Sequence, residues 1–325
     1  MLHKIHLLLP KFPTDTDTLT HPSLNNLSLF VSRAQKTAWP YQNHDACLFD
    51  LFGFDAQDLP IAPVTYLVDS PDFDENALYL RADPVYLQAD RDRVLLFDAD
   101  SALQDITLDQ AQQLVSTLNQ HFAQDGLHFL APTPTRWYLK LTKEIQPKLK
   151  LSDLSEVKGA DIHDYMPDGE DKLQWRSYLN EIQMLLYQNP VNEQREADRA
   201  LPVNSVWFWG MGQLPELPKN HWLQVWSHDV LAKGLAQLTH VAHDGLPSQV
   251  DDVLQQTGEQ LIVFEKSAQF LQAFDTHWLP ALLKALRQCH IEELVLYTNK
   301  GIFKLNSQQL RQWWKWKKNW IDIVY

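Results

Sequence analysis

The residues from 201 to 218, LPVNSVWFWGMGQLPELP, constrain the fold of this chain more than any other stretch. A run of β-branched and aromatic residues leads to two glycines, Gly210 and Gly212. This pattern is typical of a buried strand that ends in a tight turn. In α/β proteins, groups that contact a ligand often lie at such strand ends. The stretch therefore predicts either a strand close to a ligand or an ordinary core strand whose glycines only let the chain reverse.

Strand-like and helix-like segments alternate along the rest of the chain. Residues 77–141 run as strand, strand, helix and strand, which predicts a small α+β subdomain. Residues 55–74 are rich in proline and aspartate and are predicted to form loops. Towards the C-terminus a βαβ rhythm predicts a parallel sheet with helices on its faces. The clearest helical periods cover residues 108–122, 173–187, 230–238 and 278–289, and buried strands are predicted at residues 4–9, 94–97, 261–264 and 293–297.

Composition excludes several classes of function. Lysine and arginine total 28 against 41 acidic residues, a formal charge of -13. This balance argues against general binding to nucleic acid or to an anionic membrane surface. Two cysteines, Cys47 and Cys289, cannot build a disulfide framework, which favours a reducing compartment. The short N-terminal apolar run stops at Pro10 and is interpreted as a first strand, so we expect a cytoplasmic protein without a membrane span.

Three blocks of the sequence resemble one enzyme family. They are DACLFDLFGFD at residues 45–55, LRAD at 80–83 with its continuation to Arg136-Trp137-Tyr138, and a long block from about residue 159 to 238. The last contains NPVNEQR and the strand that ends in WFWGMG. In this order the blocks are similar to the archaeal-type cofactor-independent phosphoglycerate mutases. The sequence resembles still more closely a group of bacterial phosphoglycerate-mutase-like proteins, which are also called RpfE-type regulatory proteins.

The resemblance implies an alkaline-phosphatase-like parallel-sheet core with an inserted α+β subdomain. We expect the core to be discontinuous, with residues 1–75 and 200–325, and the insertion with its linking helix to occupy residues 76–199. Such enzymes use two metal ions and a serine nucleophile. Here His44, beside Asp45, stands where the serine is expected. The positions where the resemblance implies metal-binding side chains are occupied by Pro10-Lys11, Glu265-Lys266-Ser267 and Thr298-Asn299-Lys300. The sequence therefore predicts no catalytic residue, no metal site and no cofactor.

Three arginines in the matching blocks are the main candidates for ligand binding: Arg81, Arg136 and Arg195. The planar guanidinium group suits phosphate or carboxylate recognition. The alternative is that they form buried ion pairs with Asp83 or Glu193. Asn192 and Asn204 are predicted either to hold the loop around Gly210 and Gly212 or to cap the chain locally. Trp209 completes the candidate set.

Two other segments have a suggestive composition. His240, His243 and Asp244 could place two imidazoles on adjacent helical turns, but a solvated helix end is the simpler interpretation. Residues 310–320, LRQWWKWKKNW, interleave tryptophan with lysine. We interpret this segment as a docked C-terminal helix, with an exposed patch for a protein partner as the alternative.

Together these features predict a degenerate phosphoglycerate-mutase-like protein, a non-catalytic binding or regulatory module for a small phosphorylated or acidic ligand. The first alternative is an active phosphomutase or phosphatase whose ligands lie elsewhere in the sequence. The second alternative is a partner-binding protein that uses the tryptophan-rich tail.

Overall fold

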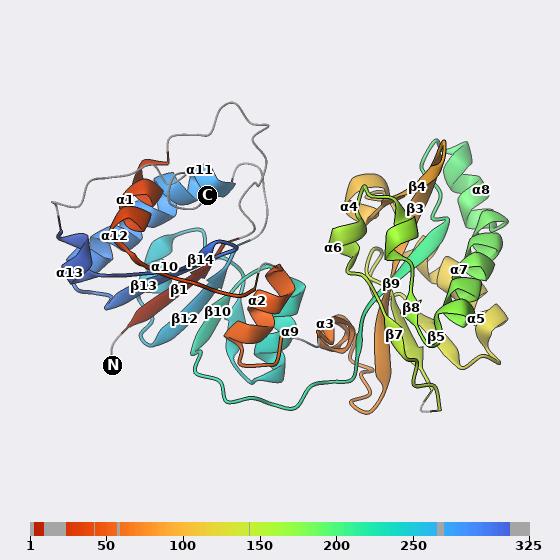
Figure 1. Ribbon diagram of the computed structural model, residues 1–325, viewed down its shortest axis with the longest axis horizontal. Helices are drawn as coiled ribbons and strands as arrows, with labels where there is room; N and C mark the ends of the chain where they lie inside the picture. Colours follow the sequence, from red (N-terminus) through yellow and green to blue (C-terminus); the bar gives the residue numbers. More distant parts are fainter. Residues whose placement is uncertain are drawn as a thin grey trace. The chain divides into compact units, whose positions relative to one another are not determined.

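The computed structural model describes residues 3–9, 24–41, 43–56, 59–142, 144–264 and 270–312, without the side chain of Phe270. The chain forms two compact units (Figure 1). Unit 1 combines Met1–Gln57 with Leu217–Tyr325, and unit 2 is Asp58–Glu216. The unit boundaries differ from the predicted ones at 75/76 and 199/200. In the described part of the chain, no helix is long and apolar enough to cross a bilayer.

Unit 1 is built on a seven-stranded sheet with the order β11-β10-β12-β1-β13-β14-β2. The first five strands in this order are parallel, and β14 and β2 are antiparallel to β13 and β14 respectively. The observed structure therefore has the predicted α/β class with a parallel sheet. The strands are β1 (Lys4–Leu8), β2 (Gln35–Thr37), β10 (Gln224–Trp226), β11 (Ala242–Asp244), β12 (Glu259–Val263), β13 (Glu293–Thr298) and β14 (Gly301–Asn306).

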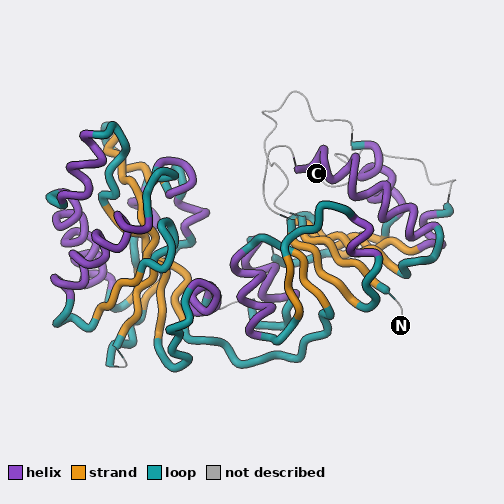
Figure 2. The backbone as a smooth tube through the Cα atoms, turned by 180° about the vertical axis from the view of Figure 1, so that it is seen from behind, coloured by secondary structure: helices purple, strands orange, loops and turns teal. Residues whose placement is uncertain are grey.

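Helices cover both faces of this sheet (Figures 1 and 2). Ile5 and Leu7 of β1 and Leu294 and Leu296 of β13 share one core with the helices of the first face. That face carries α1 (Asn25–Arg33), α10 (Val250–Leu254), α11 (Phe270–Ala273), the π-helix η2 (Phe274–Trp278), α12 (Leu279–Arg287) and α13 (Ser307–Leu310). On the opposite face lie α2 (His44–Leu51) and α9 (Val230–Leu238).

Unit 2 is organised around β3 (Leu78–Asp90), a strand of 13 residues that pairs with three others. All of the pairings are antiparallel: β9 (Ser205–Gly212) lies along one edge of β3, and β6 (Tyr138–Leu141) and β4 (Arg93–Phe97) pair with successive parts of it. β5 (Leu127–Leu130) extends the sheet beyond β6. β7 (Leu149–Lys150) and β8 (Asp168–Gly169) form a separate small ribbon.

Two layers of helices enclose the sheet of unit 2 (Figures 1 and 2). The apolar faces of α5 and α7 pack on one side through Leu114, Leu118, Trp175 and Ile182. The helices are α3 (Ile61–Asp69), α4 (Ala99–Ala102), α5 (Leu108–Phe122), α6 (Leu154–Val157), the 3-10 helix η1 (Ile162–Tyr165), α7 (Lys172–Tyr187) and α8 (Pro190–Ala197). The loop prediction for residues 55–74 is thus wrong over α3.

The aromatic stretch that leads to Gly210 and Gly212 is β9, but it differs from the prediction in two ways. The strand continues through Gly210 to Gly212 and does not break at the first glycine. It also belongs to unit 2, because Trp209 pairs with Arg81 and Val206 with Pro84 on β3. The assignment of this strand to the discontinuous core is therefore corrected.

Gly210 lets α3 approach β9 closely. Its φ is +57°, and a Cβ atom there would lie 2.9 Å from the Cβ of Ile61. Gly159 has a comparable φ of +73° but faces open space. We expect Gly210→Ala to destabilise unit 2 by about 2–4 kcal/mol and Gly159→Ala by about 1–2 kcal/mol, because only the former adds a steric clash to the backbone strain. Urea unfolding of both variants measures the difference, and equal losses would contradict the close-approach explanation.

Candidate functional site

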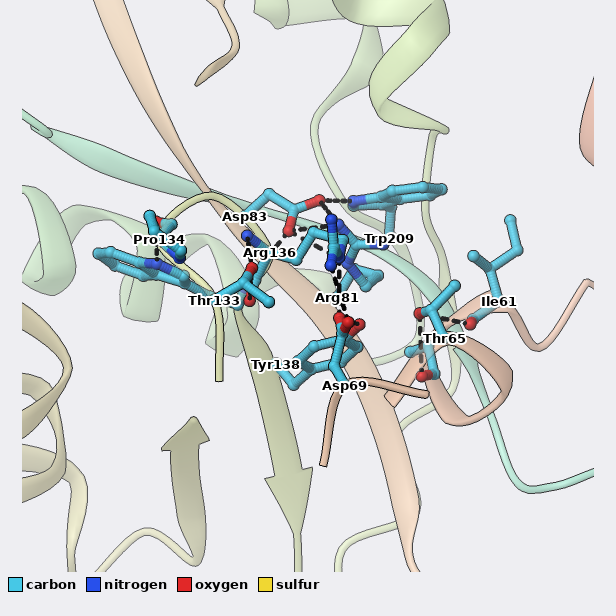
Figure 3. Close-up of polar contacts among 12 residues, drawn as sticks. Ile61, Thr65, Asp69, Arg81, Asp83, Thr133, Pro134, Arg136, Tyr138 and Trp209 are labelled. Atoms are coloured by element: carbon cyan, nitrogen blue, oxygen red, sulfur yellow. Dashed lines mark hydrogen bonds and ion pairs between the residues drawn. The ribbon is translucent and has the colours of Figure 1, made fainter. Parts of the chain in front are cut away.

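Arg81 and Asp83 form a buried ion pair on β3 (Figure 3). They lie two residues apart, so both side chains project from the same face of the strand. Nε and Nη2 of Arg81 donate to Asp83 Oδ1 at 3.1 and 2.7 Å, and Nη2 also donates to Oδ2 at 2.8 Å. Trp209 Nε1 on β9 donates to Asp83 Oδ2 at 2.8 Å, and the backbone N–H of Trp137 donates to Oδ1 at 3.1 Å.

A second ion pair lies beside the first one and joins the end of α3 to the sheet (Figure 3). Arg136 donates two hydrogen bonds to Asp69, from Nε to Oδ2 at 2.8 Å and from Nη2 to Oδ1 at 2.7 Å. The Tyr138 hydroxyl donates to Asp69 Oδ2 at 2.6 Å. The guanidinium of Arg81 stacks on the rings of Tyr138 and Trp209, with centroid distances of 5.2 and 5.0 Å. These contacts connect the two pairs into one network.

The charges of this network balance locally. Burial alone would raise the pKa of Asp69, but the hydrogen bonds from Arg136 and Tyr138 outweigh it and hold that pKa below its usual range. The hydrogen bond to Asp69 raises the pKa of Arg136. Burial works against the charge on Arg81, yet the carboxylate of Asp83 raises its pKa. Burial raises the pKa of Asp83, and the guanidinium of Arg81 with the hydrogen bonds from Trp209 and Trp137 opposes that shift. The two guanidinium groups thus each face the carboxyl group of an aspartate.

The two arginines of the network differ in the solvent exposure of their side chains. Arg81 is 7% exposed, and its Nε and Nη2 both bind Asp83, which is the ion-pair alternative raised by the sequence. The Arg136 side chain is 34% exposed. Because Asp69 occupies the edge formed by Nε and Nη2, the Nη1 end of Arg136 is the part left for a ligand. Of the three predicted arginines, Arg136 therefore has the most exposed side chain.

Arg195 does not belong to this network. It lies on α8 with a side chain that is 1% exposed. Its three nitrogens donate to Asp105 Oδ1, Gln110 Oε1 and the carbonyl of Leu201, at 2.8, 3.0 and 2.9 Å. The partner expected from the sequence, Glu193, is not among these acceptors. Arg195 thus ties α8 to the start of α5 and to the chain before β9.

The two predicted asparagines bind backbone groups away from Gly210 and Gly212. Asn192 donates to the carbonyls of Leu186 and Val203 and accepts from the Val203 N–H. Asn204 exchanges two hydrogen bonds with the backbone of Leu87, at 2.7 and 2.9 Å. The alternative that they hold the glycine loop is therefore wrong. Asn192 connects the end of α7 to the chain before β9, whereas Asn204 connects the chain before β9 to β3, 117 residues earlier in the sequence.

Asp69 and Tyr138 were missed as site residues. Asp69 lies in the region predicted as loops, and its arginine partner is 67 residues away in sequence. The apolar run IAPVTYLVD was the available signal, since a helix over it would have placed Asp69 at its last turn.

A histidine-aspartate pair lies in unit 1, at the starts of α2 and α9. His44 is the first residue of α2, after the N-cap Asn43. Its Nε2 lies 3.5 Å from Oδ2 of Asp229, the N-cap of α9, whose Oδ1 accepts the N–H of Ala232 at 2.9 Å. Burial disfavours the charged imidazole, but Asp229 outweighs it and raises the pKa of His44. The same pairing lowers the pKa of Asp229 against its burial. The carboxylate that faces His44 is therefore supplied by a different helix and not by its sequence neighbour Asp45.

The histidines near residue 240 do not share a helix. α9 ends at Leu238, and His243 and Asp244 lie on β11, so the alternative with two imidazoles on adjacent helical turns is wrong. The favoured helix end lies at Leu238, two residues before His240. Within the described ranges, no group of three or more His, Cys, Asp or Glu residues could hold a metal ion. The tryptophan-rich tail from residue 313 onwards lies outside the described residues.

Comparison with known proteins finds similarity to one enzyme class, although no protein-family model matches the chain. The 2,3-bisphosphoglycerate-independent phosphoglycerate mutase of Methanosarcina mazei is 24% identical over 111 residues, 34% of this chain and 28% of that protein. The enzyme of Methanothrix thermoacetophila is 32% identical over 66 residues, 20% of this chain and 17% of that protein. The chain is a distant homologue of cofactor-independent phosphoglycerate mutases.

The extent of this similarity is limited. The matched segment spans 28% of the length of the first of these phosphoglycerate mutases. Among solved structures, the cofactor-independent phosphoglycerate mutase of Thermoplasma acidophilum is 16% identical, with a TM-score of 0.48 over 94% of this chain and 90% of that one.

Proposed function

We propose that this phosphoglycerate-mutase-like chain is a non-catalytic binding or regulatory module for a small phosphorylated or acidic molecule. The observation that supports the loss of catalysis is the His44–Asp229 pair. The sequence resemblance puts the serine nucleophile of the enzymes at His44. In this chain an imidazole stands there, and its charged form is stabilised by a carboxylate.

Asp229 favours the protonated form of this imidazole. In that form both nitrogens carry protons, so the imidazole has no lone pair with which to attack phosphorus or to bind a metal ion. Both carboxylate oxygens of Asp229 already have partners, because one faces His44 and the other caps α9. The pair therefore acts as a bridge between the starts of two helices.

The proposed ligand contact is Arg136 in unit 2. Its guanidinium group is held in one orientation by Asp69 and is one-third exposed. A fixed guanidinium can bind a phosphate or a carboxylate with little loss of side-chain entropy. Arg81, 7% exposed, adds a second positive charge beneath it, and the two aspartates limit the strength of the field, so we expect modest affinity.

The test uses 3-phosphoglycerate as the probe, with added Mn²⁺ or Mg²⁺. We expect no conversion to 2-phosphoglycerate, and binding that is measurable by calorimetry. Arg136→Gln should weaken binding by about tenfold or more, because the amide keeps a hydrogen bond to Asp69 but loses the charge. Arg93→Gln is the matched control, since Arg93 is an exposed arginine of unit 2 whose partner is Asp90.

Two outcomes would contradict this proposal. Metal-dependent turnover that His44→Ala abolishes would establish the active phosphomutase alternative. Absence of calorimetric binding, or equal weakening by Arg136→Gln and Arg93→Gln, would remove Arg136 as a ligand contact. Thermal unfolding of each variant shows whether the fold is retained.

A further inference from the structure

Unit 2 contains a pocket of about 540 Å³. One wall is the C-terminal end of α3 and the turn after it, with Tyr66, Ser70 and Asp72. The exposed side of α5 forms the second wall, and β5 with the segment up to residue 132 forms the third. The volume lies within the range of roughly 300–1,000 Å³ that small-molecule sites occupy.

The second wall presents a row of neutral polar groups. Gln112, Ser116 and Gln120 follow one another at intervals of four residues, so they lie along one face of α5. All three are exposed. Asn119 has a different role: its side chain exchanges hydrogen bonds of 2.7 and 2.9 Å with the backbone of Phe129. This contact fixes α5 against β5, so the row keeps its place over the pocket.

The Arg136–Asp69 pair fixes the other two walls. Asp69 directly precedes Ser70 of the first wall, and Arg136 follows closely on the segment that ends the third wall at Pro132. Ser70 Oγ accepts the N–H of Asp72 at 3.2 Å, which shapes the turn between them. The pocket is therefore formed in advance by three sets of contacts within unit 2, and binding need not order its walls.

The chemistry of the lining selects a class of ligand. Amides and hydroxyls both donate and accept hydrogen bonds, which matches a molecule that carries several hydroxyl groups. Leu130 and Pro132, both partly exposed, add an apolar surface that suits the C–H face of a ring. No described residue of the lining is a lysine or an arginine. The exposed imidazole of His128 adds a group that can donate or accept a hydrogen bond, and the carboxylate of Asp72 disfavours an anion.

We infer that this pocket binds a neutral polyhydroxylated molecule, a sugar or a cyclic polyol. The site is separate from the Arg136 contact in its chemistry, and it does not rest on the proposed binding of an acidic molecule. Arg136 acts here as a positioning residue, because it holds the pocket walls through Asp69 and does not line the pocket.

Saturation-transfer NMR with D-glucose and myo-inositol as probes tests this inference on the full chain. We expect transfer to the ring C–H protons of at least one probe, with saturable binding. Ser116→Trp places an indole in the pocket from an exposed helix position and should abolish the transfer. Gln113→Trp introduces the same side chain at a neighbouring exposed position of α5 that does not line the pocket, and it should leave the transfer unchanged.

Three results would overturn the inference. They are no transfer to either probe, equal transfer in Ser116→Trp and the native chain, and equal loss in the two tryptophan variants with both still folded by thermal unfolding. Competition with 3-phosphoglycerate distinguishes the two sites: glucose binding that persists in its presence supports a separate polyol site, and displacement would replace it by a single site for acidic molecules.

Discussion

Replacing Asp83 by alanine is expected to lower the free energy of unfolding of unit 2 by about 3–5 kcal/mol. The variant leaves the guanidinium of Arg81 buried without its partner carboxylate. It also removes the acceptor of the Trp209 indole N–H and of the Trp137 backbone N–H. Unsatisfied buried donors add to the cost of the unpaired charge. Urea denaturation followed by tryptophan fluorescence measures the loss.

Two further variants show whether the loss comes from the unpaired charge. Asp90→Ala breaks an exposed ion pair with Arg93 at the other end of β3 and should change stability little. The double variant Arg81→Met with Asp83→Leu removes both charges and should cost less than Asp83→Ala alone. If Asp83→Ala destabilised the chain no more than Asp90→Ala, the buried pair would not be a stabilising contact of the sheet.

Lowering the pH from 6.5 to 4.5 is expected to cost unit 1 about 2–3 kcal/mol through His6 alone. His6 lies on β1 with its Nδ1 3.0 Å from the Tyr297 hydroxyl. Burial, followed by the positive charges of His221, Lys4 and Lys304, lowers the pKa of His6 to about 3. The imidazole is therefore neutral over this range, and its Nε2, 3.8 Å from Glu259, forms no charged pair.

The direction of this pH dependence follows from the difference between the pKa of His6 in the folded chain and its pKa in the unfolded chain. The unfolded chain takes up a proton at His6 near pH 6.5, whereas the folded chain does so only near pH 3. The contribution to stability is therefore complete above pH 6.5 and is lost as the pH falls toward 3. Urea unfolding at several pH values should show a shallower acid decline for His6→Asn, which keeps a hydrogen-bonding atom near Tyr297.

His290→Asn is the control for this prediction, since His290 is an exposed histidine of the same unit. Its stability should decline with falling pH as in the native chain. Identical acid declines in His6→Asn and the native chain would show that His6 is not the group responsible.

The helices that the sequence predicted correctly have long regular periods, and the strands that it predicted correctly are short apolar runs: β1, β4, β12 and β13. α5, α7 and α9 repeat apolar residues at helical spacing, and each buries that face. α3 was missed because its nine residues are almost uniformly apolar and include Pro63, so they show little contrast between two faces. The unit boundary was misplaced for another reason: β9 pairs with β3, more than a hundred residues earlier, and periodicity carries no information on such pairing.

In the candidate site too, contacts between residues close in sequence could be predicted, and contacts between distant residues could not. Asp83 was named as a possible ion-pair partner, and it lies two residues from Arg81 on the same strand face. Asp69 could not be paired with Arg136 without knowing that α3 ends beside the sheet. At His44 the sequence drew attention to Asp45, but the carboxylate that contacts its imidazole is Asp229, supplied by a different helix. The ligand-binding role of these residues remains a prediction.

The position of β1 in unit 1 determines when this unit can form during synthesis. β1 lies between β12 and β13 and pairs Lys4 with Glu259 and Glu293. Every strand of unit 2 leaves the ribosome before either neighbour of β1 exists. Chains emerge from the ribosome at about 5–20 residues per second, so β1 remains without its parallel neighbours for many seconds. All strands of unit 2 have been synthesised by then. The nascent chain must therefore carry an apolar strand with two open edges, which makes β1 a segment open to chaperone binding and to aggregation.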